Sequence, residues 1–177
     1  MRIKKKQSYI IYIIVFVLVL AWSKYIGGDE RTERTLDNVD YYVKVVKVSD
    51  GDTFIGLTDD KERVRFRMQG IDAPESKQAY SKKSTDKLSE LIFGKEVGIE
   101  IHTKSDRYGR PVVYVYTLDG TDVCAEMIRS GMAWHYKQYD KSEHYSSLEK
   151  EARRNKAGLW QDANPTPPWE YRNNNRN

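Results

Sequence analysis

The sequence predicts an α+β protein, built as a small closed barrel of five β-strands with about three helices packed on it and an N-terminal hydrophobic leader helix before it. Three strand-like segments come first, then a helix, two more strands and further helices. Apolar residues make up 39% of the 177 residues, which is enough for one compact core. Barrels of this element order include the OB type, whose open face commonly takes oligonucleotides.

The first three strands follow from residue type, alternation and turn signals. Residues 41–48 are rich in Val and Tyr and end at a turn over residues 49–51, after which residues 52–58 form the second strand. In residues 64–68, apolar side chains alternate with two arginines. This third strand therefore buries one face and presents arginines on the other.

A helix is predicted over residues 77–93, because Leu and Ile side chains cluster on one side and Gly94 follows as a C-cap. The remaining predicted elements are strands over 97–101 and 111–118, helices over 122–131 and 141–156, an extended Pro-rich strap over 164–169 and a disordered end over 173–177. Two strands and then helices complete the order expected of an OB-type barrel.

Residues 1–28 are predicted as a targeting leader. Arg2 to Lys6 is a positively charged stretch, and residues 9–22 are uninterrupted apolar. That run is short for a spanning helix of about 20 residues and long enough for the core of a signal peptide. We expect a signal peptide or a single-pass membrane anchor, with a buried core helix as the other interpretation. The charge bias places the body outside the cytoplasm, after a linker over residues 29–40.

The net charge of +4 is unevenly distributed. Residues 1–28 hold five basic and no acidic side chains, which leaves about −1 for the rest of the chain. A basic pI therefore does not by itself indicate a nucleic-acid partner, and any basic surface must be local. The single cysteine, Cys124, excludes an intramolecular disulfide and lies in an apolar stretch, so we expect a buried small side chain rather than a nucleophile.

Three short strings carry chemistry at the ends of predicted strands. They are DGDT at 50–53, IDAPE at 71–75 with Arg67 before it, and DRYGR at 106–110. Carboxylate oxygens bind hard cations, and guanidinium groups hold the charge of a pentacovalent phosphorus at two points. Taken singly, each string fits a turn or a solvated strand. Their order across one β-rich body predicts metal-assisted cleavage of a phosphodiester.

With these motifs the chain resembles the staphylococcal nuclease, or thermonuclease, family over about residues 41–172. The resemblance rests on DGDT at 50–53, FRMQGIDAPE at 66–75, DRYGR at 106–110, KAGLW at 156–160 and NPTPPWEYR at 164–172. It implies an OB barrel with three helices and a calcium-dependent phosphodiesterase that acts on DNA and RNA. The nuclease domain is then expected over 41–162, with the strap and tail over 163–177.

The resemblance implies a calcium site. Asp52 and Asp72 match the calcium carboxylates of the family, and the backbone carbonyl of Ala73 matches a further ligand. The best-known member has Thr at the position of Ala73, but Ala keeps the carbonyl. Asp50 lies near this site and is expected to support the turn.

The resemblance also implies the residues that act on the substrate. Glu75 matches the carboxylate that contacts the attacking water, and Arg67 and Arg110 match the two arginines that grip the scissile phosphate. Tyr136 and Tyr139 lie where the family places tyrosines that contact bases and phosphates, although core aromatics are an equal interpretation.

The expected function is therefore a calcium-dependent, sugar-nonspecific endonuclease outside the cytoplasm, acting as a monomer on DNA and RNA. The alternative is a non-catalytic OB-type module of the same fold that binds nucleic acid or protein. Degenerate modules of that kind lose carboxylates or arginines that this chain retains. A structural protein of the cell envelope is a third interpretation, which leaves the charged motifs unexplained.

Overall fold

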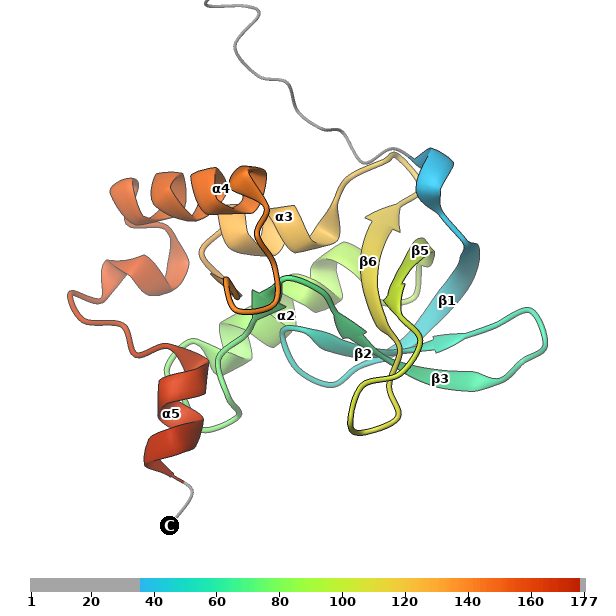
Figure 1. The fold of residues 1–177 in the computed structure, drawn as a ribbon, viewed down its shortest axis with the longest axis horizontal. Helices are drawn as coiled ribbons and strands as arrows, with labels where there is room; N and C mark the ends of the chain where they lie inside the picture. Colours follow the sequence, from blue (N-terminus) through green and yellow to red (C-terminus); the bar gives the residue numbers. More distant parts are fainter. Residues whose placement is uncertain (1–35, 176–177) are drawn as a thin grey trace, which may run out of the picture. The chain divides into compact units, whose positions relative to one another are not determined.

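The computed structural model describes residues 36–175, in which a five-stranded barrel has helices gathered on one side (Figure 1). The barrel is closed in the order β1-β2-β3-β6-β5. Its strands are β1 (Tyr41–Val48), β2 (Thr53–Leu57), β3 (Arg63–Met68), β5 (Glu96–Thr103) and β6 (Val112–Thr117). The five strands and the barrel predicted from the sequence are confirmed, with bounds that differ by at most two residues.

The barrel is mixed, because β3 pairs with β6 in parallel while the other neighbours are antiparallel. In the parallel pair Arg67 lies opposite Val112 and Met68 opposite Val113. The C-terminal end of β3 therefore lies beside the start of β6, so two of the predicted motifs approach one end of the barrel.

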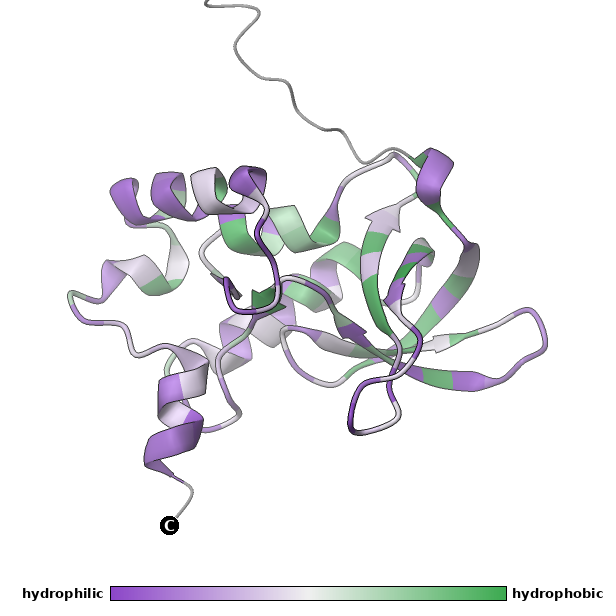
Figure 2. Ribbon diagram, in the orientation of Figure 1, coloured by the Kyte–Doolittle hydropathy of each residue, from purple (hydrophilic) through white to green (hydrophobic). Residues whose placement is uncertain are grey.

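Alternation along the strands fills the barrel interior. Figure 2 shows hydrophobic and hydrophilic bands following one another on these strands. Phe54 and Phe66 are fully buried and stack with ring centroids 5.2 Å apart. On β3 Phe66 and Met68 are buried and Arg65 is exposed, as the sequence pattern predicts, whereas Arg67 is mostly buried in the cluster of acids at the end of the strand.

The described residues form four α-helices on one side of the barrel, namely α2 (Ser81–Ile92), α3 (Val123–Arg129), α4 (Glu143–Arg154) and α5 (Pro168–Asn174). Side chains cap two of them, since Asp122 accepts from the backbone N–H of Ala125 and Ser142 from that of Tyr145. Helix α2 begins later than predicted because Tyr80 takes a left-handed φ of 66°. Cys124 on α3 is a buried free thiol, as expected.

Two short elements were not predicted. β4 (Ile71–Asp72) pairs antiparallel with β7 (Trp134–His135) outside the barrel. Two-residue strands have no periodicity that a sequence can reveal, since their pairing depends on tertiary contacts. β4 fixes the position of Asp72 between the barrel and the helices.

The C-terminal prediction is wrong at its end, where α5 is helical rather than an extended strap that passes into a disordered tail. Pro167 and Pro168 restrict φ to a range that suits the start of a helix, and Pro168 is its first residue. The short 3₁₀ helix η2 (Gly158–Gln161) precedes this segment. Around it a second hydrophobic cluster forms from Trp134, Ala152, Leu159 and Trp160, with Tyr80, Ala157 and Trp169 packed on it.

The predicted leader over 1–28 lies outside the described residues and stays a prediction. Within residues 36–175, no helix has the length and apolarity needed to cross a bilayer. The end of the predicted linker belongs to the folded body, since η1 (Leu36–Asn38) precedes β1 and Leu36 and Val39 pack on the core. Asp40 also accepts a hydrogen bond from the backbone N–H of Ile101 at 2.7 Å.

Candidate active site

The turn between β1 and β2 packs tightly against its neighbours. The Asp50 carboxylate accepts a hydrogen bond from the backbone N–H of Asp52 at 3.1 Å. A Cβ atom added to Gly51 would lie 1.8 Å from Oγ of Ser84 and 2.7 Å from Cβ of Ala73. Only glycine permits this approach, which brings the turn against α2 and the segment after β4.

Asp52 is buried and connects this turn to the segment after β4. Its Oδ2 accepts a hydrogen bond from the backbone N–H of Ala73 at 2.8 Å, and its Oδ1 accepts from the Thr53 hydroxyl at 3.1 Å. These bonds fix the orientation of the carboxylate before any ligand arrives.

Arg67 joins the two predicted calcium carboxylates. One of its terminal nitrogens, Nη2, lies 3.1 Å from Oδ2 of Asp52 and 3.3 Å from Oδ1 of Asp72, whose side chain is almost fully buried. The guanidinium also donates to the backbone carbonyls of Met68 and Ile71, at 2.5 and 2.8 Å. Both carboxylates therefore lie next to the same guanidinium nitrogen, Nη2 of Arg67.

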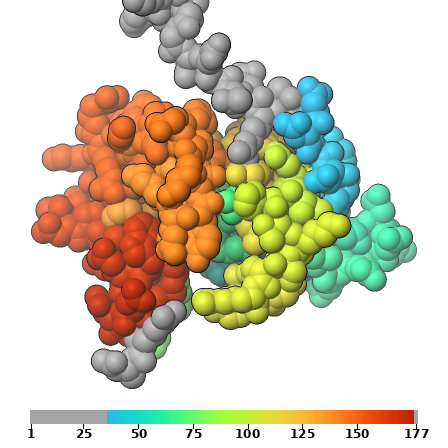
Figure 3. Space-filling view, viewed as in Figure 1, coloured from blue at the N-terminus to red at the C-terminus, as the bar shows by residue number. Residues whose placement is uncertain are grey.

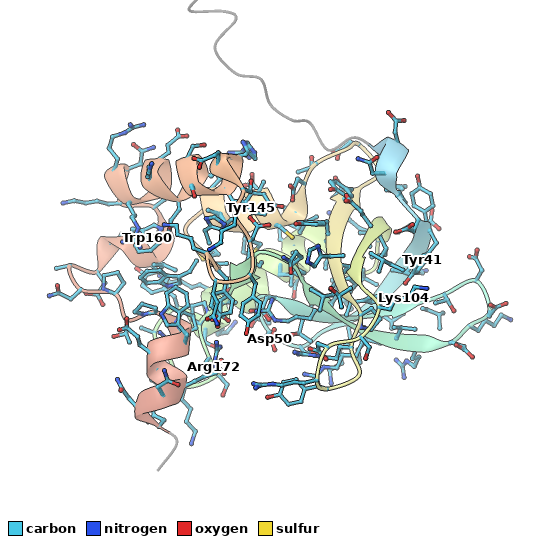
Figure 4. The ribbon with its side chains drawn as sticks, viewed as in Figure 1. Tyr41, Asp50, Lys104, Tyr145, Trp160 and Arg172 are labelled. Carbon is cyan, nitrogen blue, oxygen red and sulfur yellow. The ribbon has the colours of Figure 1, made fainter. Side chains whose placement is uncertain are left out.

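A second guanidinium, not predicted from the sequence, enters the site from α5. Arg172 donates to both oxygens of Asp72, at 3.1 and 2.8 Å, and to Oε1 of Glu75 at 2.6 Å. Figure 4 labels Arg172 at the edge of α5 that faces the barrel. The available signal was the NPTPPWEYR string, which ends at this arginine, but an expected disordered tail gave no reason to place it in a site.

Glu75 is linked to Asp72 by Arg172, which donates hydrogen bonds to both side chains. Its side chain is about one-third exposed, at 38%, so it remains open to water. Its backbone N–H donates to the side chain of Gln78, which in turn donates to the carbonyl of Thr166 ahead of α5. The loop after β4 and the C-terminal segment are therefore tied together at this acid.

Arg110 lies apart from this cluster. Its Nε and Nη2 both donate to Oδ2 of Asp106, at 2.9 and 2.7 Å, and no hydrogen bond or ion pair links it to Asp52, Asp72 or Glu75 among the described residues. An open pocket of about 540 Å³ lies beside it. The pocket is lined by Arg63, Val64, Arg65, Tyr108, Gly109, Arg110 and Pro111. It is a local basic surface on a body of nearly neutral charge.

The two predicted tyrosines lie beside the cluster. Tyr136 stacks in parallel on Trp169 of α5, with ring centroids 5.2 Å apart, and meets Tyr139 edge to face at 4.8 Å. Burial, and next the charge of Asp72, raises the pKa of Tyr136. Tyr139 is exposed and available to a ligand, whereas Tyr136 supports α5.

Comparisons with known proteins agree on one family. The model of the staphylococcal nuclease homologues matches residues 65–162. An uncharacterized endonuclease of Escherichia coli is 46% identical over 133 residues, which cover 75% of this chain and 86% of the relative. The chain belongs to the staphylococcal nuclease family. It is accordingly a nuclease, a hydrolase of phosphodiester bonds, and the family resemblance seen in the motifs is confirmed.

Two further relatives extend this agreement. An uncharacterized endonuclease of Haemophilus influenzae is 40% identical over 129 residues, which cover 73% of this chain and 71% of the relative. A micrococcal nuclease of Shigella flexneri is 37% identical over 148 residues, which cover 78% of this chain and 84% of the relative. The similarity therefore spans most of each chain rather than a single motif.

The electrostatics of this nuclease-family site are those of crowded acids. Burial raises the pKa of Asp72 to about 6; hydrogen bonds from Arg172 oppose this rise and the charge of Asp52 adds to it. Burial and then the charge of Asp52 also raise the pKa of Asp50 to about 6. Hydrogen bonds to Asp72 raise the pKa of Arg172 further above its usual value. A cation between these acids would relieve their mutual repulsion.

The donor set fits a hard divalent cation. Among residues 36–175 no group of three or more His, Cys, Asp or Glu side chains is arranged as a metal centre. Asp52 and Asp72 nevertheless converge on one nitrogen of Arg67, and the backbone of Ala73 is adjacent. Two carboxylates and a carbonyl, completed by water, suit calcium better than they suit a transition metal.

Proposed function

We propose that this chain is a calcium-dependent endonuclease that hydrolyses both DNA and RNA. The observation that carries this proposal is the convergence of Asp52 and Asp72 on Arg67, whose Nη2 lies 3.1 Å from an oxygen of Asp52 and 3.3 Å from one of Asp72. Asp52, Asp72 and the Ala73 carbonyl would hold calcium. When bound, the cation supplies positive charge that polarises a phosphoryl oxygen and favours ionisation of water.

The chain's own side chains account for the remaining work. Glu75, exposed to water beside Asp72, orients the attacking water and accepts its proton. Arg67, already fixed at the carboxylates, stabilises the charge that gathers on the phosphate. Arg110 takes part when its ion pair with Asp106 opens, since the loop carrying both is at the surface.

We further propose that the reaction takes place outside the cytoplasm. The support is the sequence of the leader, in which basic residues precede an apolar run. The body then meets calcium at extracellular concentrations, which suits a site of only two carboxylates.

The test is digestion of supercoiled plasmid and of a single-stranded RNA by the full chain, with calcium or with a chelator. Glu75→Gln serves as the site variant, because it keeps the shape of the side chain and removes its charge, and Arg154→Ala on the exposed face of α4 serves as the matched control. Cleavage that requires calcium, is lost in Glu75→Gln and persists in Arg154→Ala supports the proposal. Folded wild-type protein that binds the nucleic acid without cleaving it would instead indicate a binding module.

A further inference from the structure

Arg172 has the geometry of a functional residue rather than of a surface contact. Its guanidinium makes three hydrogen bonds to two acids of the site, and one of those acids, Asp72, is 1% exposed. A two-point contact to a buried carboxylate is among the stronger polar interactions in proteins. The contact brings a residue of the last helix to the acids proposed to hold calcium and water.

Arg67 and Arg172 flank the same carboxylate. Oδ1 of Asp72 lies 3.3 Å from Nη2 of Arg67 and 3.1 Å from Nη1 of Arg172. Two guanidinium groups from distant parts of the chain therefore converge where the cation is proposed to bind. Arg110, the second arginine expected from the family resemblance, is instead paired with Asp106.

Helix α5 is held in place by packing. The Trp169 ring stacks on Tyr136 at an interplanar angle of 3° and meets Trp134 edge to face at 5.5 Å. Pro168, the first residue of the helix, is buried. Trp169 and Arg172 are three residues apart, so they lie on one face of the helix. Figure 3 shows the red C-terminal segment packed against orange residues near α4.

A cation at Asp52 and Asp72 would compete with Arg172 for the oxygens of Asp72. The guanidinium would keep its hydrogen bond to Glu75 and so would stay beside the site. The N–H groups that it withdraws from Asp72 would then be free to bind the substrate. A phosphate oxygen is the natural acceptor for those donors, because guanidinium and phosphate match in charge and in planar two-point geometry.

We propose that Arg172 is a catalytic residue that contacts the scissile phosphate opposite Arg67, and that it occupies Asp72 when no cation is bound. The proposal rests on the proposed nuclease function. Arg172 would then act at the site besides Arg110, and the described structure already bonds it to the acids of the site.

The experiment compares full-length wild type with Arg172→Ala, Arg172→Lys and the control Arg154→Ala. Calcium affinity is measured without substrate by titration of tryptophan fluorescence, and kcat and KM are measured on an oligonucleotide at saturating calcium. We expect Arg172→Ala to bind calcium several-fold more tightly, because a competing positive charge is gone. Its kcat should fall about 10²–10³-fold, the usual loss for one transition-state contact.

The Arg172→Lys variant distinguishes a catalytic role from a purely structural one, since it keeps the charge and removes the two-point geometry. A kcat at least about tenfold below wild type is expected for Arg172→Lys with an unchanged melting temperature. Wild-type kcat in a folded Arg172→Ala or Arg172→Lys protein would overturn the catalytic role, even if calcium affinity rises. Unchanged calcium affinity would overturn the competition at Asp72.

A separate measurement covers failure of the proposed function. If wild type cleaves nothing, binding of a fluorescein-labelled phosphorothioate oligonucleotide in calcium decides the role of Arg172. Weaker binding by Arg172→Ala than by Arg154→Ala supports the phosphate contact, and equal binding overturns it.

Discussion

Asp72 accepts hydrogen bonds from Arg67 on β3 and Arg172 on α5, while Asp52 accepts one from the backbone of Ala73. Every one of these acceptors is buried, so each carboxylate oxygen has a fixed direction in which it can receive a ligand. Buried charges remain ionised only when they are paired in this way. At the scale of single residues, the site is a set of acidic side chains that are oriented by arginines and by a backbone N–H group. We propose that a cation and a phosphate take the place of some of these contacts.

Arg110→Ala tests whether the arginine outside this cluster takes part in catalysis. We expect the fold to persist, because the ion pair that is lost joins two residues of one loop, four positions apart, and holds no other element in place. Activity should fall about 10²–10³-fold, because Arg110 is proposed to contact the phosphate during the reaction. Plasmid nicking rates and thermal melts of Arg110→Ala are compared with those of Arg129→Ala on α3. Turnover equal to that of the control would remove Arg110 from the site.

Gly51→Ala tests the close approach that places Asp52. The added methyl group would overlap the Ser84 side chain and Ala73, so we expect a loss of about 1–3 kcal/mol in the free energy of unfolding. Urea unfolding of Gly51→Ala, Ser84→Gly and the double variant forms a mutant cycle. Because Ser84→Gly removes the nearest obstructing atoms, the cost of Gly51→Ala should be smaller in its background. Equal costs in both backgrounds would contradict the close contact.

At the scale of elements, one buried carboxylate organises the segment between β7 and α4. Asp140 is bonded to the ring of His135, to the hydroxyl of Tyr114 and to the backbone N–H of Ser142. The segment also carries Tyr136, which meets Tyr139 and stacks on Trp169 of α5, so its conformation sets part of the surface on which α5 packs. A local hydrogen-bond network thus supports a helix that follows much later in the chain.

Stability should depend on the ionisation of Asp140. Burial alone would raise its pKa, but bonds from His135, Ser142 and Tyr114 lower the pKa to about 2. The folded value lies below the unfolded value of about 3.9, so this stabilisation is present above pH 4 and is lost as the pH falls toward 2. Asp140→Asn should reduce the free energy of unfolding by about 1–3 kcal/mol at pH 7 and by less at pH 3. Urea unfolding at the two pH values measures both; an equal loss at each would contradict the prediction.

The sequence predicted the barrel strands because alternation of Val, Ile and Phe with polar residues has a clear period of two. It also predicted that Asp52, Arg67, Asp72 and Glu75 would be brought together, because they stand in short strings at strand ends, and the structure places them in one cluster. It did not predict α5, since a helix of seven residues that begins at the second of two prolines is too short to show a helical pattern. Arg172 was missed for the same reason: its contacts join residues about one hundred positions apart, which no local pattern encodes.

At the scale of the whole molecule, charge is distributed by region. The leader holds a net +5, and the rest of the chain is near −1. Arg63 and Arg65 are nevertheless exposed, and they line the open pocket together with Tyr108 and Arg110. We expect substrate binding to depend on this local surface and to weaken steeply with salt.

Salt dependence measures how many of these arginines meet phosphates. Arg63→Ala and Arg65→Ala should each raise KM at low salt and reduce the slope of log KM against log salt by about 0.7 for single-stranded substrate. Their kcat should stay near wild type, because neither contacts the acids of the site. Lys150→Ala on α4 is the control. A slope unchanged from wild type in both arginine variants would place the substrate elsewhere.

The position of α5 in the chain has a consequence for biosynthesis. The barrel, Asp52, Arg67, Asp72 and Glu75 all precede residue 120, whereas Arg172 is translated much later. β7, which pairs with β4 at Asp72, and helices α3 and α4, which pack on the core, are complete by residue 154, so these acids can assemble before Arg172 is made. Premature termination before α5 would therefore yield a chain that keeps Asp52, Arg67, Asp72 and Glu75 but lacks the Arg172 guanidinium that bonds Asp72 and Glu75.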